Sequence, residues 1–400
     1  MKDYFSKYSD ILNDPYNHIV FNSVKDDEAY IVGGYIRDVF LGKEVMDRDY
    51  VVRGDFKKAA AHVATKTGGR LIQIGKNILC RVLLKDGICM DFTQMNEDIE
   101  NDLSGRDFTI NALAWSPATG LIDLFSGMKD IEKGFVRVVR KENLSSDPVR
   151  LIRAYRLSGE TSFEIDEDSR LMLREMAHKI NEVKPERITL EFFKILNLHD
   201  PFRALKMMLE DNILTCLICL SNNQLQLKLN NINEVNKIIN QNTFKNLLEP
   251  GTIYSQGLSY KGLLRLELLL KESGGNLLRL SSRIMKRLLS IGKACRMMQE
   301  DNLEAEERLY LFFKVAGDAA FDFLVINNLL KYLPDLERFE NIQEKSLLST
   351  DEIMDILGIG EGVILGKAKE FIRRAEFYRK IKGRNDAVEM LRSNIEIFLI

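Results

Sequence analysis

The sequence predicts an α+β protein, with a mixed α and β head at the N-terminus and a long helical remainder. Short apolar runs that end at glycines, which are typical of buried strands, are confined to about the first 140 residues. Beyond them, apolar residues recur at i, i+3, i+4 and i+7, which is the spacing of amphipathic helices. Because 400 residues exceed what one hydrophobic core usually serves, we expect more than one domain.

The head is expected to alternate strands with helices. The expected elements are a strand at residues 30–32, a helix at 36–41, a strand at 49–53, a helix at 56–67 and strands at 78–84 and 88–92. A Gly-Gly pair stops the first strand, and a second pair stops the alanine-rich helix. The Asp-Gly dipeptide between the last two apolar runs predicts a hairpin.

The chain beyond residue 140 has the pattern of successive amphipathic helices. Clear examples lie at residues 149–157, 169–180, 186–196 and 201–214. Residues 221–246 are rich in Asn and Gln, and we interpret them as an exposed helix pair. We find no internal repeat with a fixed period.

The composition is that of an ordinary globular protein, with 45% apolar and 29% charged residues. No run of about 18 apolar residues predicts a membrane helix, and the polar N-terminus is unlike a signal peptide. The five cysteines form no disulfide framework, so we expect a reducing, cytoplasmic compartment and interpret Cys216 and Cys219 as core residues. With a net charge of −2 and a pI near 6.2, any nucleic acid must be held by local basic patches.

The first candidate site joins a diglycine turn to a pair of aspartates. Gly33 and Gly34 precede the helix that carries Arg37, and Asp47 and Asp49 open the next strand. Residues i and i+2 of a strand face the same side, so the two carboxylates can hold divalent cations together. Hard oxygen ligands suit Mg²⁺, and a glycine turn at a helix N-terminus lets backbone N–H groups approach a triphosphate. A lone Asp-x-Asp is usually surface charge, and a Gly-Gly turn between a strand and a helix is common in proteins. The prediction therefore depends on the ordered combination of the two.

Three further residues complete this candidate site. Asp91, in the strand at 88–92, is the candidate third carboxylate of a two-metal site, with a surface or edge acid as the alternative. Arg106 is predicted to contact a triphosphate, and Asn111 to orient a sugar or backbone group. The alternative for this segment is a loop that enters a buried region, with Asp107 as a cap.

A basic stripe follows on the helix that begins near residue 147. Asp147 is expected to cap this helix, with Pro148 at its first position. Arg150, Arg153 and Arg156 recur every three residues, and a solvated charged face is the alternative. Asp147 can accept from the exocyclic amine of cytosine or adenine while Arg150 donates to the ring nitrogen. This pair would select CTP and ATP without a nucleic-acid template.

These motifs resemble the class II tRNA nucleotidyltransferase and bacterial poly(A) polymerase family, within the DNA polymerase β superfamily. YIVGGYIRDVFLGKEVMDRDYVV resembles its motif A, RDFTINALA its motif B, DPVRLIRAYRL its base-reading motif and VKPERITLEFFKIL its neck element. The resemblance implies a polymerase-β-like nucleotidyltransferase head with a mixed sheet, followed by an all-α neck, body and tail. The implied boundaries are 1–140 for the head, 141–200 for the base-recognising neck, 201–300 for the body and 301–400 for the tRNA-binding tail.

The resemblance also implies a reaction and residue roles. Asp47 and Asp49 correspond to metal ligands that hold Mg²⁺. Nucleotide contacts correspond to Gly34, Arg37 and Arg106, and the base- and phosphate-contacting helix to Asp147, Arg150, Arg153 and Arg156. The implied reaction is in-line transfer of CMP or AMP from CTP or ATP to a tRNA 3′ end, with release of pyrophosphate.

Two departures from the family pattern concern how much of CCA is added. The residue before Asp147 is Ser146, where the family often has Glu. The segment 92–105 is short, whereas members that complete CCA or add only A usually carry a longer loop there. The short segment favours a CC-adding form that leaves the final A to a separate A-adding enzyme. The alternatives are a full CCA-adding or A-adding enzyme, a poly(A) polymerase, and a non-catalytic RNA-binding relative.

The predicted RNA contacts lie near the C-terminus. Residues 367–384 are rich in Lys and Arg, and the glycines of LGIGEGVILG just before them can present backbone amides to a phosphate. The candidate RNA-binding residues are Lys367, Lys369, Arg373 and Arg374. A solvated helix is the alternative.

Overall fold

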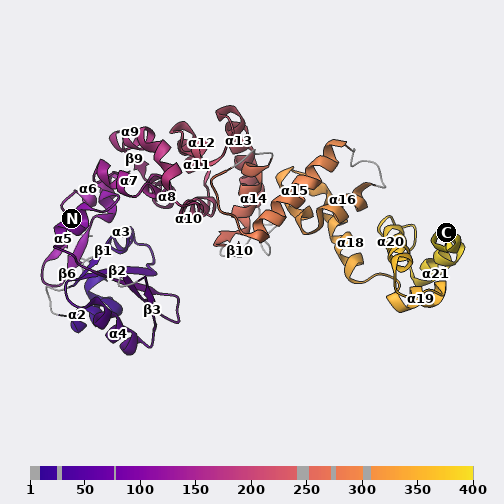
Figure 1. Cartoon of the computed structure of the whole chain (residues 1–400), viewed down its shortest axis with the longest axis horizontal. Helices are drawn as coiled ribbons and strands as arrows, with labels where there is room; N and C mark the ends of the chain where they lie inside the picture. Colours follow the sequence, from indigo (N-terminus) through magenta and orange to yellow (C-terminus); the bar gives the residue numbers. More distant parts are fainter. Residues whose placement is uncertain are drawn as a thin grey trace. The chain divides into compact units, whose positions relative to one another are not determined.

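The structure is a computed structural model that describes residues 10–24, 29–75, 78–240, 252–271, 276–300 and 308–399. The chain divides into two compact units, Met1–Cys219 and Leu220–Ile400 (Figure 1). Among the helices in these ranges, none is long and apolar enough to cross a membrane. The finer division into four domains stays a prediction.

The first unit contains a seven-stranded mixed sheet. Its strands are β1 (Ala29–Val32), β2 (Asp47–Val52), β3 (Arg70–Ile74), β4 (Leu79–Leu83), β5 (Cys89–Gln94), β6 (Ala114–Ser116) and β7 (Gly120–Ile122). The order across the sheet is β3-β4-β5-β2-β1-β6-β7, with β2 and β5 parallel and the other neighbours antiparallel. The predicted strands and the β4–β5 hairpin are present, so the α+β prediction is confirmed.

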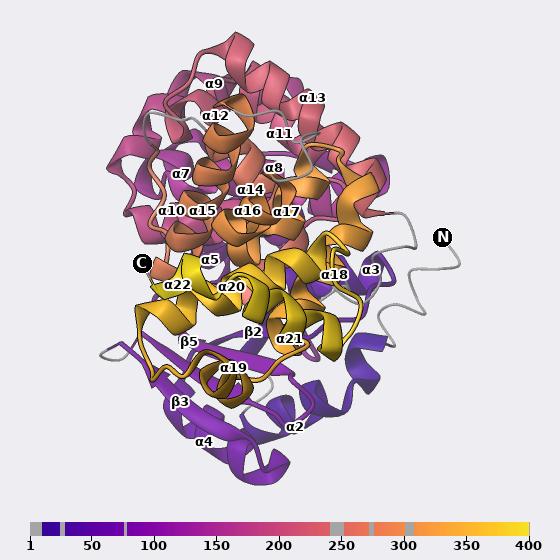
Figure 2. The same cartoon turned by 90° about the vertical axis from the view of Figure 1, so that its right-hand side faces the viewer.

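The two faces of this sheet have different covers. Helix α4 (Phe56–Thr67), which spans the predicted residues and ends at Gly68 with φ of 67°, packs on β3, β4 and β5. Helix α2 (Pro15–Ser23) packs beside α4 (Figure 2). On the other face, α5 (Ile99–Ser104) buries Leu103 in a cluster with Val51 of β2. Asp47 and Asp49, at the start of β2, remain exposed on that second face.

Helices form the rest of the first unit. They are α3 (Gly34–Phe40), α6 (Gly127–Lys133), α7 (Lys141–Ser146), α8 (Val149–Thr161), α9 (Glu167–Met176), α10 (Pro185–Leu196), α11 (Phe202–Glu210) and α12 (Ile213–Leu217). Helices α8 and α10 pack against each other and bury Tyr155 and Phe192. A short parallel pair, β8 (Phe135–Val136) and β9 (Glu164–Ile165), adjoins α8. The region was expected to be purely helical, and this strand pair is a difference from that expectation.

The second unit is almost entirely helical. Its elements are α13 (Asn222–Ile239), β10 (Ile253–Ser255), β11 (Leu258–Ser259), α14 (Tyr260–Leu270), α15 (Ser282–Glu300), α16 (Arg308–Ala316), α17 (Ala320–Ile326), α18 (Leu333–Glu344), α19 (Thr350–Leu357), α20 (Val363–Phe377), α21 (Arg384–Ser393) and α22 (Ile395–Leu399). The small β10–β11 hairpin is the exception to the predicted all-α architecture.

Two local predictions are wrong. In its described part, residues 221–240, the Asn/Gln-rich segment forms one helix, α13, rather than an exposed pair, because Leu225, Leu229 and Ile232 give it a buried face. Residues 241–246 of that segment lie outside the described ranges. Cys219 is exposed rather than in the core, because the apolar neighbours of the two cysteines are buried in their place, and Cys216 is only partly buried.

Candidate active site

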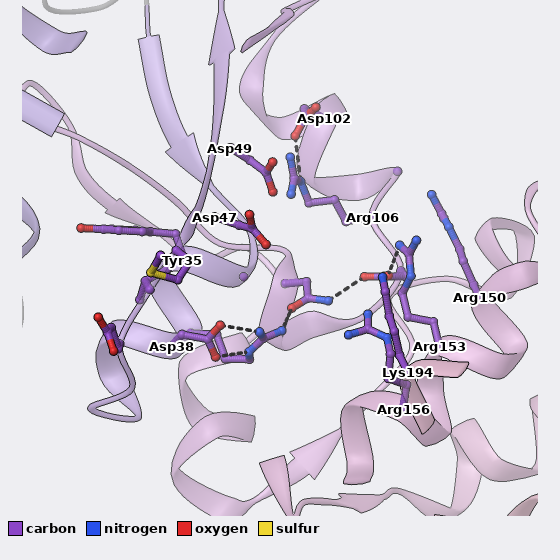
Figure 3. Close-up of a pocket in the computed structure, with 18 of the residues that line it drawn as sticks. Tyr35, Asp38, Asp47, Asp49, Asp102, Arg106, Arg150, Arg153, Arg156 and Lys194 are labelled. Carbon is purple, nitrogen blue, oxygen red and sulfur yellow. Dashed lines mark hydrogen bonds and ion pairs between the residues drawn. The ribbon is translucent and has the colours of Figure 1, made fainter. Parts of the chain in front are cut away.

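A cavity of about 870 Å³ opens in the first unit beside the start of β2 (Figure 3). Its lining includes six acidic and six basic side chains: Asp38, Glu44, Asp47, Asp49, Asp102, Asp107, Arg37, Arg106, Arg150, Arg153, Arg156 and Lys194. Four of the basic residues come from α8 and α10, whereas the acidic residues come from the head. The cavity therefore has an acidic side and a basic side.

The aspartate pair lies on one face of β2, as predicted. Asp47 and Asp49 both line the cavity, and Arg48 between them is buried on the opposite side of the strand. Although Asp49 is open to the cavity, burial by the surrounding protein raises its carboxyl pKa to about 6. The Arg106 guanidinium opposes this rise, and the neighbouring carboxylates of Asp91 and Asp47 add to it. The pair is therefore crowded with negative charge, which a bound cation would relieve.

The residues present fit a divalent cation that shares its shell with a substrate. No group of three or more His, Cys, Asp and Glu side chains is arranged to hold a metal ion in the part of the chain that the structure describes. Two carboxylates supply only part of a coordination shell, which is how Mg²⁺ is commonly held when waters and substrate phosphates complete it. The carboxylate pair therefore fits Mg²⁺, and the identity of the metal stays a prediction.

Asp91 lies near the pair but is held by another residue. It is in register with Asp49 on the neighbouring parallel strand. Arg81 on β4 donates to both oxygens of the Asp91 carboxylate, at 2.8 and 2.7 Å. Asp91 is not among the residues that line the cavity, and a role as third metal ligand would use the lone pairs that Arg81 leaves free. That role stays a prediction. Sequence reasoning missed Arg81, although the predicted hairpin places it directly across from Asp91.

Gly33 shares its space with Arg106. Its φ of 75° and ψ of −134° are unfavourable for residues with a side chain, and its N–H donates to the Leu113 carbonyl at 3.0 Å. A Cβ at this position would lie 2.6 Å from Nη1 of Arg106. Arg106 donates through Nε to Asp102 at 2.9 Å, and its guanidinium lies beside Asp49 (Figure 3). The glycine turn thus leaves room for the Arg106 guanidinium beside Asp49.

A chain of hydrogen bonds connects the head to α8. Arg37 is buried and donates to both oxygens of Asp38, at 2.9 and 2.7 Å, and to Asn111 Oδ1 at 2.6 Å. Asn111 donates to Asp107 at 3.0 Å, and Arg153 donates to the second Asp107 oxygen at 3.0 Å. Burial raises the pKa of Asp107, but Arg153 and Asn111 outweigh it and leave the pKa below its ordinary value. Arg37 and Asn111 are therefore engaged within the protein, and their contacts with a nucleotide stay a prediction.

The basic stripe on α8 faces the cavity. Arg156 forms an ion pair with Glu191 of α10 at 2.7 Å, and Arg153 lies 3.9 Å from the same carboxylate. Arg150 donates to a backbone carbonyl of α7 at 3.2 Å, and no partner for its buried Nε lies in the described part of the chain. Lys194, one turn after Glu191, also lines the cavity and is 54% exposed. Sequence reasoning missed Lys194, although its helical spacing from Glu191 places it on the same face.

Asp147 differs from its predicted placement. It ends α7, and Pro148 rather than Asp147 occupies the cap position of α8. The predicted N-cap is wrong because the Asp147 carboxylate accepts from Arg187 of α10 at 2.8 Å instead of from backbone N–H groups of α8. Asp147 is also absent from the residues that line the cavity. Its role in base reading with Arg150 stays a prediction.

In the second unit, the predicted RNA-binding residues all lie on α20. Lys367 is exposed, and Lys369 and Arg374 are partly buried. Arg373 donates to the side chain and backbone oxygens of Gln343, at 2.9 and 3.2 Å, and so holds α20 against α18. Lys367 is therefore the most accessible of the four for a phosphate.

Family models match two parts of the first unit. One, described as the poly A polymerase head domain, matches residues 80–137. The other, described as a probable RNA and SrmB-binding site of polymerase A, matches residues 162–218.

Curated relatives match a little under half of the chain. A CC-adding tRNA nucleotidyltransferase of Synechocystis sp. is 37% identical over 174 residues, which cover 42% of each chain. A CCA-adding enzyme of Leuconostoc mesenteroides is 30% identical over 204 residues, 48% of this chain and 51% of the relative. An A-adding tRNA nucleotidyltransferase of Aquifex aeolicus is 29% identical over 222 residues, 46% of this chain and 26% of the relative. The matched regions span about half the length of these relatives or less.

Solved structures resemble nearly the whole chain. The Thermotoga maritima CCA-adding enzyme complexed with tRNA has a TM-score of 0.74 at 20% identity, and the match covers 98% of both chains. A CCA-adding enzyme complexed with CTP has a TM-score of 0.76 at 21% identity, over 98% of this chain and 97% of the other. At these identities the likeness concerns the fold, and it confirms a polymerase-β-like head followed by helices.

Proposed function

Because this chain belongs to the tRNA nucleotidyltransferase family, we propose that it is an enzyme that adds nucleotides to the 3′ end of a tRNA without a nucleic-acid template. The observation that carries the proposal is the aspartate pair, Asp47 and Asp49, on one face of β2 in a cavity whose opposite side is basic. The proposed substrates are CTP, ATP and a tRNA that lacks its CCA end. The proposed compartment is the cytoplasm, because all five cysteines are free thiols.

Different residues of the cavity would bind the metal, the triphosphate and the RNA. Divalent cations held by Asp47 and Asp49 would activate the RNA 3′-hydroxyl and neutralise charge on the triphosphate. Arg106 lies beside Asp49 and binds the triphosphate on the acidic side. Arg150 and Lys194 on the basic side bind phosphates of the nucleotide or of the RNA end, because neither is fully occupied by protein carboxylates. Asp38 and Asp102 neutralise Arg37 and Arg106 until the nucleotide arrives.

We further propose that the product is CC rather than CCA. Only four residues separate the end of β5 at Gln94 from the start of α5 at Ile99, so the segment 92–105 holds no long loop. The short segment is the feature on which the CC-adding interpretation depends, and the similarity to the CC-adding tRNA nucleotidyltransferase of Synechocystis sp. supports it. The final A would then require a separate A-adding enzyme.

A product-length assay tests the proposal directly. Purified protein is incubated with Mg²⁺, a tRNA lacking CCA and each labelled nucleotide singly or together, and products are separated at single-nucleotide resolution. Addition of two C residues supports the CC-adding form, and three residues would replace it with full CCA addition. A long ladder with ATP would indicate a poly(A) polymerase, and no incorporation at all would reject the enzyme activity.

Isosteric variants assign the activity to the acidic pair. Asp47→Asn and Asp49→Asn each remove one negative charge with little change in shape, so we expect incorporation to fall by at least about 1,000-fold because transition-state charge loses its counter-ion. Asp86→Asn is the matched control, because Asp86 is an exposed head aspartate outside the cavity lining. Wild-type incorporation by either pair variant would reject the site.

A further inference from the structure

The residue between the two cavity aspartates is a buried arginine. Only 6% of the Arg48 side chain is exposed. Its Nη2 donates to Asp14 Oδ2 at 2.6 Å, and its Nη1 donates to the Val45 carbonyl at 3.0 Å. Its guanidinium carbon lies 5.2 Å from the Tyr16 ring centre and 5.3 Å from that of Tyr35. The guanidinium is thus held by an ion pair, a backbone carbonyl and two aromatic rings.

Asp14 joins this arginine to the N-terminus of α2. Its Oδ1 accepts from two backbone N–H groups of α2, at 3.0 and 2.9 Å, as the helix cap, while its Oδ2 accepts from Arg48. Asn17 of the same helix is fully buried and donates to the Tyr35 hydroxyl at 2.9 Å. The Tyr50 hydroxyl, on β2, donates to Asn17 Oδ1 at 2.5 Å. Helix α2 is therefore fastened to β2 at two positions.

The start of β2 needs such a restraint because the sheet supports it on one side only. Pairing with β1 begins at Asp49, opposite Val32, after which β1 ends in the glycine turn. Asp47 and Arg48 pair only with β5, opposite Cys89 and Met90. With a paired strand on one side alone, this strand end has fewer backbone restraints than the rest of β2, so the position of Asp47 depends more on side-chain contacts nearby.

Burying an arginine is an expensive way to fill this space. An apolar side chain would pack on the same face without removing a charge from water. The ion pair to Asp14 offsets the desolvation cost only when Arg48 and Asp14 lie in one particular geometry. The buried pair therefore fixes the position of the strand end. An interaction behind a metal ligand that fixes its orientation commonly changes metal affinity by about 10- to 100-fold when removed.

We propose that Arg48 is a positioning residue, held by Asp14 at the cap of α2, which keeps Asp47 and Asp49 in the arrangement that binds a divalent cation. The inference rests on the proposed function in assigning the cation to this pair. It is tested by metal binding alone, so its failure is distinguishable from the failure of the proposed activity.

The test measures Mn²⁺ binding to the full chain by electron paramagnetic resonance, without nucleotide or RNA. Arg48→Met keeps an unbranched side chain and removes the charge and every donor, so the Kd for Mn²⁺ should rise about tenfold or more. Asp14→Asn keeps the cap acceptor and removes the charge, so a smaller rise is expected. Arg48→Lys, which keeps the charge, should recover part of the affinity. In nucleotide addition, Arg48→Met should lower kcat with KM for CTP within threefold of the wild type.

Two controls separate positioning from general loosening of α2. Tyr16→Phe keeps the ring beside Arg48 and removes only the exposed hydrogen bond to Asp86, so Mn²⁺ binding should equal that of the wild type. Val20→Ala truncates a fully buried side chain of α2 that forms none of the contacts of Arg48 given above, so it should lower stability without weakening Mn²⁺ binding.

The outcomes decide the proposal either way. Wild-type Mn²⁺ affinity in Arg48→Met, or an equal loss of affinity in Val20→Ala, overturns it. If circular dichroism shows that Arg48→Met does not fold, Asp14→Asn decides by the same criterion. A wild-type chain that binds Mn²⁺ but adds no nucleotide to tRNA would reject the proposed function and leave this inference standing.

Discussion

Replacing Gly33 with alanine tests whether the glycine turn reserves space for Arg106. The new Cβ would lie 2.6 Å from Nη1 of Arg106, whereas ordinary contacts begin at 3.4 Å, so the guanidinium must move by 0.8 Å or more. A misplacement of about 1 Å can reduce an enzyme's rate by roughly 100-fold. The backbone adds a second effect, because a side chain at φ of 75° and ψ of −134° costs about 1–3 kcal/mol.

The assay is kcat/KM for CTP with a tRNA that lacks CCA, together with urea unfolding of the same samples. We expect Gly33→Ala to lose about 100-fold in kcat/KM and about 1–3 kcal/mol in the free energy of unfolding. Gly105→Ala is the matched control. Gly105 also lines the cavity, its φ is −84°, and the nearest atom to its new Cβ would be 3.6 Å away. A folded Gly33→Ala protein with kcat/KM within threefold of the wild type would refute the reasoning.

Two buried carboxyl groups give opposite dependences of stability on pH. Asp107→Asn removes the charge of a buried carboxylate from its ion pair with the partly exposed Arg153, and it should cost about 1–3 kcal/mol of unfolding free energy at pH 7. Because Arg153 and Asn111 keep the pKa of Asp107 below its ordinary value despite burial, its contribution is present above about pH 4 and lost as pH falls further. Urea unfolding of both proteins at pH 7 and pH 3 checks this, and an equal difference at both pH values would contradict it. For Glu267 of α14, burial and then the Asp322 carboxylate raise the pKa well above its ordinary value, so stability falls as pH rises from about 4 through that raised pKa. Glu267→Gln should therefore be more stable than the wild type at pH 8 and similar to it at pH 4, and a variant less stable than the wild type at pH 8 would rule out a protonated Glu267.

Features that depend on residues close together in the chain could be predicted from the sequence. The period of two in a strand places Asp47 and Asp49 on one face whatever the rest of the fold does, and the structure has them there. Alanine content and a terminal glycine define α4 locally, and an Asp-Gly turn defines the β4–β5 hairpin. In each case the cause lies within a few residues of the effect.

Side-chain partners that are distant in sequence could not be predicted in this way. Asp147 was expected to cap α8, but it pairs with Arg187, which is 40 positions away. Arg48 is the middle residue of the Asp-x-Asp motif, and nothing near it in the sequence indicates its partner Asp14, which is 34 positions away. For Asp147, local backbone N–H donors and the distant Arg187 guanidinium compete for one carboxylate. Tertiary packing decides the outcome, because the bond between two charged groups forms only once the fold has brought them together.

A net charge of −2 gives the protein no overall attraction for its two proposed polyanionic ligands, a nucleoside triphosphate and a tRNA. The cavity resolves the difficulty by separating charge rather than adding it. Its six acidic and six basic side chains cancel in sum, but Arg150, Arg153, Arg156 and Lys194 gather on α8 and α10, away from the aspartate pair. A cation at the pair would leave the whole cavity positive, so affinity for a nucleotide triphosphate should depend on the cation being bound first. In this arrangement the acidic pair serves the binding of a polyanion, which its own charge would otherwise oppose.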